Sequence, residues 1–237
     1  MRVLRDRKRN LPGAATNRLK YLSAMFSWAV ERGYLQFNPR REVKKLAHPT
    51  TGFRTWSLAD VRQYEAFYPV GTKQRLALAL LLYTRVRRSD LVRLGRPNMT
   101  GAMITYIPNK TRHSTLVTVT IPILLPLAEV LKASSLGKRT FLETGHGASF
   151  TPAGFGQRFR EWCNAAGLPE CTAHGLRKLG ATLSAEGGAT VQELMCMFGW
   201  SSPQQALIDT RAADAKRLGG TAANKMLTGM CHALGVT

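Results

Sequence analysis

The stretch Thr84-Arg85-Val86-Arg87-Arg88-Ser89-Asp90-Leu91 carries three arginines within eight residues and decides how the chain around it is interpreted. Residues 73–83, which precede it, are apolar almost all round, and this predicts a buried helix. From Arg88 to Leu94 the pattern is that of a short amphipathic helix, which Gly95 ends. The sequence therefore predicts a basic connection between two helices.

Helices dominate the rest of the chain. Ser57 and Asp60 predict a capping box for a helix to about Phe67, and Thr72 caps the helix at 73–83. Two β-branched, alternating segments, 102–107 and 115–121, predict strands joined by a hairpin loop over 108–113. Beyond Pro122 we expect helices at 123–133, 152–166, 174–186, 190–198 and 203–218, with Gly219-Gly220 after the last. The fold class is therefore mixed α+β, mainly helical, with one small antiparallel sheet.

The first 45 residues are the most basic part of the chain, with twelve Lys and Arg against three Asp and Glu. Thr16 predicts the N-cap of a helix that continues to Gly33. The next stretch, 40–54, mixes basic residues with Pro49 and Gly52, which is typical of an interdomain linker. One helix and a tail do not make a domain, so we expect this element to be the end of something larger.

The whole chain of 237 residues has a formal net charge of +20, which favours a polyanionic partner because Lys and Arg gain from neutralising phosphates. Nucleic acid is the leading candidate, while a merely soluble basic protein and an anionic lipid surface remain alternatives. The longest apolar run, 76–83, is too short to span a bilayer, and no secretory segment follows the Arg-rich start. The four cysteines lack metal-site spacing, so we expect reduced thiols, no metal and no cofactor.

Four segments in order carry a family resemblance: residues 84–91, then Lys110-Thr111 in the hairpin loop, then His174-Gly175-Leu176-Arg177-Lys178, then Phe198-Gly199-Trp200. They resemble the tyrosine recombinases, the phage-integrase family, whose pattern is a T-G-x-R-x-S-E/D-L box, a hairpin Lys, an H-x-L-R-H box and an L-G-H/W box. The resemblance implies a tyrosine-recombinase-like catalytic domain at 56–220 and the remnant of a helical DNA-clamping core-binding domain at 1–46. A linker at 47–55 and a C-terminal tail at 221–237 complete this division.

Carried over, the resemblance implies a catalytic, phosphate-activating set of Arg87, Lys110, His174, Arg177 and Trp200. Two guanidinium groups can hold the phosphate oxygens bidentately while negative charge grows on them. A Lys can protonate the leaving oxygen, a His can move the proton of the nucleophile, and an indole N–H can donate to the phosphate. Such a set requires no metal.

Each of these residues also has a purely structural interpretation. An Arg beside Asp90 would form a solvated ion pair, and Lys110 would be an ordinary turn residue. His174 would only cap a helix or fill a core, and Trp200 would only be part of a core. His113 and His146 are expected to be surface loop residues.

The chain departs from the family pattern at three positions. Nine residues after Trp200, where the pattern has the nucleophilic Tyr, stands Asp209, and all six tyrosines precede His174. A carboxylate brings a negative charge toward an anionic phosphate, although carboxylates do form acyl phosphates in some enzymes. Asp209 is therefore either a poor nucleophile or an ordinary exposed helix residue. Arg85 replaces the pattern's Gly, and Lys178 replaces its second His.

The resemblance thus implies a site-specific recombination or integration protein that binds duplex DNA and activates the scissile phosphate but is impaired in covalent cleavage. The alternatives are a non-catalytic DNA-binding protein that occludes or assists a full-length recombinase, and a generic basic nucleic-acid component. Self-association into a tetrameric synapse is expected by analogy. The resemblance implies a cytoplasmic, nucleoid-associated protein that is bacterial or phage-encoded. The residues expected to contact DNA are Arg18, Lys20, Arg40, Arg41, Lys44, Lys45 and Lys178.

Overall fold

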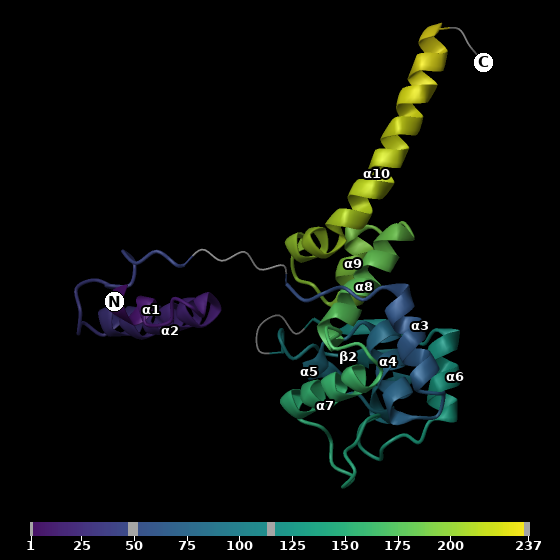
Figure 1. Cartoon of the computed structure of the whole chain (residues 1–237), viewed down its shortest axis with the longest axis horizontal. Helices are drawn as coiled ribbons and strands as arrows, with labels where there is room; N and C mark the ends of the chain where they lie inside the picture. Colours follow the sequence, from purple (N-terminus) through teal and green to yellow (C-terminus); the bar gives the residue numbers. More distant parts are fainter. Residues whose placement is uncertain (1, 47–51, 113–116, 235–237) are drawn as a thin grey trace. The chain divides into compact units, whose positions relative to one another are not determined.

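The computed structural model describes residues 2–46, 52–112 and 117–234, and the chain divides into two compact units, Met1–Gly52 and Phe53–Thr237 (Figure 1). The segment 47–51, which includes most of the expected linker, lies outside the described residues. Arg54, near the end of that expected linker, already belongs to the second unit, as does the buried Trp56.

The first unit consists of helix α1 (Arg2–Asp6), helix α2 (Pro12–Glu31) and the chain that folds back on α2. The sequence did not predict α1, and α2 begins four residues before the expected cap at Thr16. Pro12 explains the early start, because its fixed φ suits the first turn, where an N–H is not needed. The amide of Asn38 then donates to the Ser23 carbonyl and the Ser27 hydroxyl of α2, at 3.0 and 2.9 Å, and ties the returning chain to the helix.

The second unit starts with two helices whose caps were correctly predicted. Helix α3 (Leu58–Phe67) has the Ser57–Asp60 capping box, and α4 (Lys73–Thr84) has Thr72 as its N-cap. Residues 76–81 of α4 are all buried, and α4 packs against α6 (Leu125–Ala133) and α8 (Ala173–Glu186). The almost wholly apolar helix of the sequence is thus the centre of the main core.

Helix α5 (Arg88–Leu91) is shorter than the predicted 88–94. The chain leaves the helix at Val92, and the Leu94 carbonyl accepts from the Phe141 N–H at 2.8 Å instead of continuing a helical ladder. A 3₁₀ turn, η1 (Arg96–Asn98), leads into the sheet. The predicted amphipathic pattern was correct in type, and a tertiary backbone contact ended the helix early.

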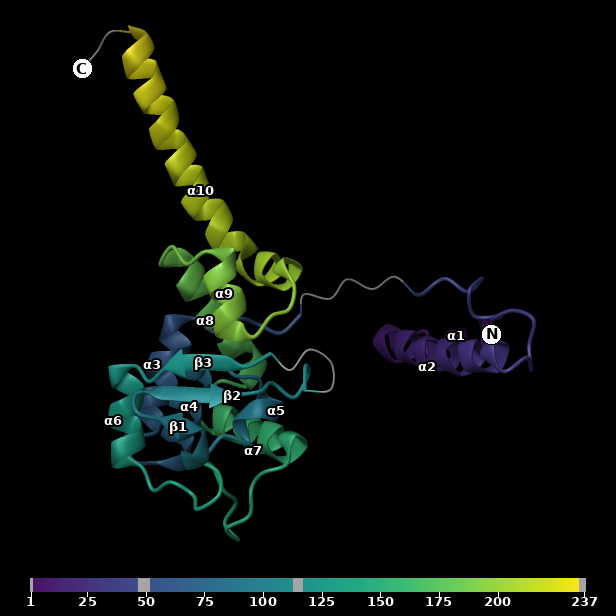
Figure 2. The same ribbon diagram turned by 180° about the vertical axis from the view of Figure 1, so that it is seen from behind.

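The sheet has three antiparallel strands in the order β1 (Met99–Thr100), β2 (Met103–Tyr106) and β3 (Val119–Pro122), shown in Figure 2. The predicted hairpin is confirmed, with Ile104 opposite Ile121. Strand β1 was missed because two residues are too few to show alternation. Strand β3 begins later than the predicted 115, and residues 113–116, which include His113, lie outside the described residues.

The remaining helices are α7 (Pro152–Ala165), α9 (Val191–Phe198) and α10 (Pro203–Leu234). Their predicted starts agree within one residue, but the prediction that the last helix ends at Leu218 was wrong. Helix α10 continues through Gly219 and Gly220 and takes up most of the expected tail. Glycine in a helix interior costs about 1 kcal/mol relative to alanine, a cost that α10 tolerates twice without ending.

Cys163 and Cys171 are buried and Cys196 is exposed, and all three are free thiols, as the sequence predicted. Burial raises the pKa of the Cys163 thiol to about 12. His146 is exposed in a loop, also as predicted. None of the helices in the described ranges combines the length and the apolar character that a membrane crossing requires.

Candidate functional site

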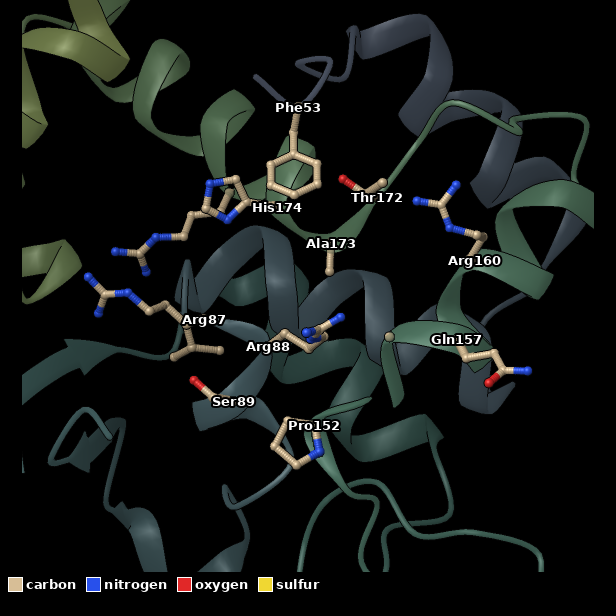
Figure 3. A pocket seen from close by; sticks show the side chains of 13 residues that line it. Phe53, Arg87, Arg88, Ser89, Pro152, Gln157, Arg160, Thr172, Ala173 and His174 are labelled. Carbon is tan, nitrogen blue, oxygen red and sulfur yellow. The ribbon is translucent and has the colours of Figure 1, made fainter. Parts of the chain in front are cut away.

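A pocket of about 600 Å³ opens in the second unit where α5, α7 and the start of α8 meet (Figure 3). It collects four arginines and a histidine, and its described lining contains no acidic side chain. The lining residues are Phe53, Val86, Arg87, Arg88, Ser89, Pro152, Gly156, Gln157, Arg160, Thr172, Ala173, His174 and Arg177. Three of the five residues in the predicted phosphate-activating set, Arg87, His174 and Arg177, therefore lie in one basic pocket.

Arg177 lies on α8 and is only 5% exposed. Its guanidinium group donates to the carbonyl oxygen of Arg85 and, at 2.8 Å, to that of Phe198. The same group lies 4.8 Å from the Phe198 ring centre and 5.7 Å from that of Trp200. These contacts fix the position of the Arg177 charge at the edge of the pocket.

Trp200 is buried and does not line the pocket. Its ring stacks on Phe198 at 4.5 Å, in a small core cluster with Ala181, Leu194 and Ala206. The geometry therefore favours the structural interpretation for Trp200, whose ring packs against the Arg177 guanidinium group.

Arg87 occupies the N-cap position of α5 and is half-buried. Its guanidinium group makes no hydrogen bond and no ion pair with any part of the chain that the structure describes. The ion pair with Asp90 that the purely structural interpretation requires is not formed, and the buried Asp90 carboxylate instead accepts the Asn109 backbone N–H at 2.8 Å. The Arg87 charge is thus available to a ligand of the pocket.

His174 lies in the first turn of α8 and is exposed to the pocket. It is not the helix cap, because the Thr172 hydroxyl accepts the Gly175 N–H at 3.1 Å and performs that role. The imidazole ring packs on Phe53, with 4.8 Å between ring centres. Neither structural interpretation of His174, as a cap or as a core residue, agrees with this geometry.

Residues 58–216 match the model of the phage integrase family. The chain belongs to the phage integrase family. Among curated proteins it is 26% identical to the integrase of Mycobacterium phage L5, a match that covers 88% of this chain and 61% of that protein's length. It is 27% identical to the tyrosine recombinase XerC of Mycobacterium tuberculosis, over 84% of this chain and 72% of XerC.

Solved structures of phage integrase family members share the fold. The chain aligns with a lambda integrase dimer bound to a COC′ core site with a TM-score of 0.70 and 20% identity, over 84% of this chain and 73% of that one. A lambda integrase tetramer bound to a Holliday junction gives a TM-score of 0.67, also at 20% identity, over 84% of this chain and 59% of that one.

Arg85 stands where the family pattern has glycine, and its backbone shows why glycine suits the position. Its φ of +57° makes it the one residue other than glycine with positive φ in the described ranges. The Arg85 side chain packs over Gly180 of α8, where a Cβ would lie 3.2 Å from Arg85 Cγ, and burial lowers the pKa of its guanidinium group. The backbone turn is kept, and the Arg85 carbonyl oxygen still accepts a hydrogen bond from the Arg177 guanidinium group.

Two further predicted site residues lie outside the pocket. Lys110 is exposed in the β2–β3 loop, which is anchored where Asn109 contacts Asp90 and where Arg93 donates to the Asn109 side chain at 2.9 Å. Lys178 donates to the Phe53 carbonyl at 3.0 Å, so its ammonium group ties the start of the unit to α8.

Asp209, at the family's Tyr position, lies in α10 between the buried residues Ala206 and Thr210. Its own side chain is outside the described part of the chain.

The sequence analysis missed Arg88 and Arg160 as site residues. Arg88 was quoted only as part of the motif, and Arg160 was one of 34 basic residues without a pattern of its own. A signal was present in α7, where Gly156 and Arg160 lie one turn apart on the same helix face. Only the tertiary structure brings that face to Arg88.

In the first unit, Lys20, Arg40 and Lys45 line a hollow of about 350 Å³ together with Ser23, Ala24 and Ser27. Arg41 and Lys44 are exposed. Arg18 instead donates to the Leu4 carbonyl at 3.0 Å and joins α2 to α1. Across the described residues, no group of three or more His, Cys, Asp or Glu side chains is placed to hold a metal ion.

Proposed function

We propose that this protein is a site-specific DNA recombination or integration protein that binds duplex DNA and holds one backbone phosphate in the basic pocket. The observation that carries the proposal is the convergence of Arg87, His174 and Arg177 on a single pocket whose described lining contains no acidic residue. Arg177 would supply a fixed charge, and Arg87 would close on the phosphate from the other side. Lambda integrase structures with the same fold contain DNA, which supports the proposal.

His174 is exposed at the pocket and can exchange a proton with the oxygen that attacks or leaves the phosphorus. Lys110 would act as the acid for the leaving oxygen if its loop moves onto bound DNA. The anchor from Asn109 to Asp90 sets where that loop begins. Lys178 would contribute to the local positive potential from its place beside Phe53.

We also propose that the chain binds the phosphate without forming a covalent DNA intermediate, because Asp209 replaces the family's Tyr. A carboxylate at this position carries a charge that the phosphate repels. In the first unit, Lys20, Arg40 and Lys45 would add contacts to the DNA backbone, joined by Arg41 and Lys44, whereas Arg18 would act mainly by holding α1.

The test begins with selection of bound duplexes from a random-sequence DNA library, followed by a nicked suicide substrate that carries the selected sequence. We expect no covalent adduct with the unchanged chain and an adduct with Asp209→Tyr, while Asp209→Phe serves as the control without a nucleophile. An adduct formed by the unchanged chain would contradict the loss of cleavage. No sequence preference in the selection would contradict site-specific binding.

A second candidate function, occlusion or assistance of a full-length recombinase, is favoured by the distal part of α10. There Leu218, Met226, Leu227 and Met230 are all exposed, an apolar set that suits contact with another protein. The same surface would serve self-association into a tetramer on DNA. Mixing the chain with an active recombinase of the same selected site discriminates, because occlusion lowers the partner's recombination rate and assistance raises it.

A further inference from the structure

The basic pocket is larger than one phosphodiester group requires. Its volume of about 600 Å³ lies in the middle of the range that encloses drug-sized ligands, whereas a phosphate group has only five heavy atoms. Figure 3 shows Arg87 and His174 on one side of the pocket, Arg160 on the other, and Arg88 between them. The predicted phosphate-binding set therefore occupies one part of the pocket only.

The remaining part contains a pair of arginines that the proposed chemistry does not use. Arg88 and Arg160 both line the pocket, and neither forms a hydrogen bond or an ion pair with the described residues. Both side chains bring a positive charge to the same pocket, and like charges repel each other. An anion between them would remove this repulsion.

Gly156 of α7 determines where the Arg88 guanidinium group lies. A Cβ built on Gly156 would overlap Arg88 Nη1 and would lie 2.9 Å from Arg88 Cζ, so the guanidinium group rests directly on the helix backbone. Arg160 follows four residues later on the same face, about 6 Å further along the helix axis. The missing side chain thus leaves the space that the Arg88 guanidinium group occupies, on the helix face that also carries Arg160.

We infer that Arg88 and Arg160 form a second phosphate subsite, which binds the backbone phosphate next to the one held by Arg87 and Arg177. This inference rests on the proposed function, because it assumes that the pocket takes a nucleic-acid strand. Two phosphates of one strand in a single pocket fix the direction of the strand as well as its position. The subsite would therefore decide which side of the first phosphate faces His174.

The test uses two small probes with the full chain, followed by NMR titration of the arginine Nε–H signals. TpT contains one backbone phosphate and TpTpT contains two. We expect TpTpT to bind about tenfold more tightly than TpT, which corresponds to one added charge-assisted contact. Arg88→Gln and Arg160→Gln should each remove most of this advantage, so that each weakens TpTpT binding several-fold more than TpT binding.

Arg158→Gln is the matched control, because Arg158 lies on the same helix, pairs with Glu161 and does not line the pocket. Gly156→Ala gives a second, independent test. It improves the helix propensity of α7 but displaces the Arg88 guanidinium group, so it should reduce TpTpT binding about as much as Arg88→Gln does. Combined with Arg88→Gln it should add no further loss.

The inference is overturned if TpTpT and TpT bind equally to the unchanged chain, or if Arg88→Gln and Arg160→Gln weaken TpTpT no more than Arg158→Gln does. Failure of the proposed function has a different signature. In that case Arg87→Gln would leave TpT binding unchanged, whereas a failure of the second subsite alone leaves the Arg87 dependence of TpT binding intact. Absence of binding of either probe would overturn both.

Discussion

The two sides of the basic pocket hold their arginines in opposite ways. On the α8 side, Arg177 is buried and bonded to the carbonyls of Arg85 and Phe198. On the side formed by α5 and α7, Arg87, Arg88 and Arg160 line the pocket without a hydrogen bond to the described part of the chain. One side is built into the core, whereas the other presents charge to the pocket.

This difference separates two functions of one residue type. A guanidinium group whose donors are partly used by carbonyl groups is fixed in place before a ligand arrives, and it also joins α4, α8 and α9. A guanidinium group without partners contributes its full set of donors to the ligand and little to the fold. Stability and binding should therefore respond differently to substitutions on the two sides.

Of the substitutions that test this difference between the two sides of the pocket, Arg177→Ala should have the largest effect on stability. It leaves two carbonyls without their donor and removes the cation from the Phe198 and Trp200 rings, so the free energy of unfolding should fall by about 3 kcal/mol. Arg87→Ala should change that free energy by less than about 0.5 kcal/mol. Urea denaturation at pH 7, followed by circular dichroism, measures both.

Both substitutions should weaken TpT binding about tenfold or more, since each removes a charged donor from the same phosphate. Equal stability losses for Arg177→Ala and Arg87→Ala would show that the two sides of the pocket do not differ as described.

Gly175→Ala should destabilise the α8 side of the pocket at the first turn of α8, where Gly175 lies close to Arg54 and Trp56. A Cβ on Gly175 would overlap the Arg54 carbonyl oxygen and lie 3.1 Å from Trp56 Cδ1, and Trp56 cannot yield because its indole N–H donates to the Thr172 carbonyl at 2.9 Å. We expect a loss of about 2 kcal/mol in the free energy of unfolding. Gly145→Ala, with open space around it, is the control and should stay within about 0.5 kcal/mol. A similar value for the two variants would contradict the close approach.

The sequence was informative where the determinants are local. The Ser57 capping box, the Thr72 cap and the alternation in β2 depend on neighbouring residues, and all three were predicted correctly. The motif around Arg87 and the His174-to-Lys178 box could be assigned to the family because their order and spacing are visible along the chain.

The sequence did not predict the features that are determined by contacts between residues far apart in the chain. Nothing local indicates that Asp90 is buried against the hairpin loop, that Trp200 lies behind Arg177 or that Gly156 makes room for Arg88. The glycine pair at 219–220 misled for a related reason, because glycines weaken a helix without forcing it to end. These features depend on pairs of residues that are distant in the sequence.

Arg85→Gly tests the same difference with a smaller expected effect, because it changes the backbone whose carbonyl accepts a hydrogen bond from Arg177. Its positive φ costs an L-residue about 1 kcal/mol, a cost that glycine avoids. Arg85→Ala removes the same contacts with Gly180 but keeps that cost. The glycine variant should therefore be about 1 kcal/mol more stable than the alanine variant in urea denaturation. Equal stability of the two variants would mean that the backbone at Arg85 is not strained.

The smallest effect concerns Asp60, which holds the beginning of the second unit through Arg54 at 3.0 Å. Burial raises the pKa of the Asp60 carboxyl, but the hydrogen bonds from Arg54 and Ser57 outweigh this and hold the pKa below its usual value. A carboxyl with a lowered pKa in the folded state stabilises the fold at pH values above its unfolded pKa of about 3.9. That contribution is lost as the pH falls through the lower folded pKa.

Asp60→Asn removes this titration, so the free energy of unfolding should depend less on pH below about pH 4 than it does in the unchanged chain. Glu161→Gln is the control, because its ion pair with Arg158 is exposed and should contribute little. If Asp60→Asn keeps the full acid dependence of the unchanged chain, the ion pair with Arg54 does not stabilise the start of the unit. The Arg54 side chain would then be positioned by its contacts with Cys171 Sγ at 3.0 Å and with the Glu170 carboxylate at 3.8 Å.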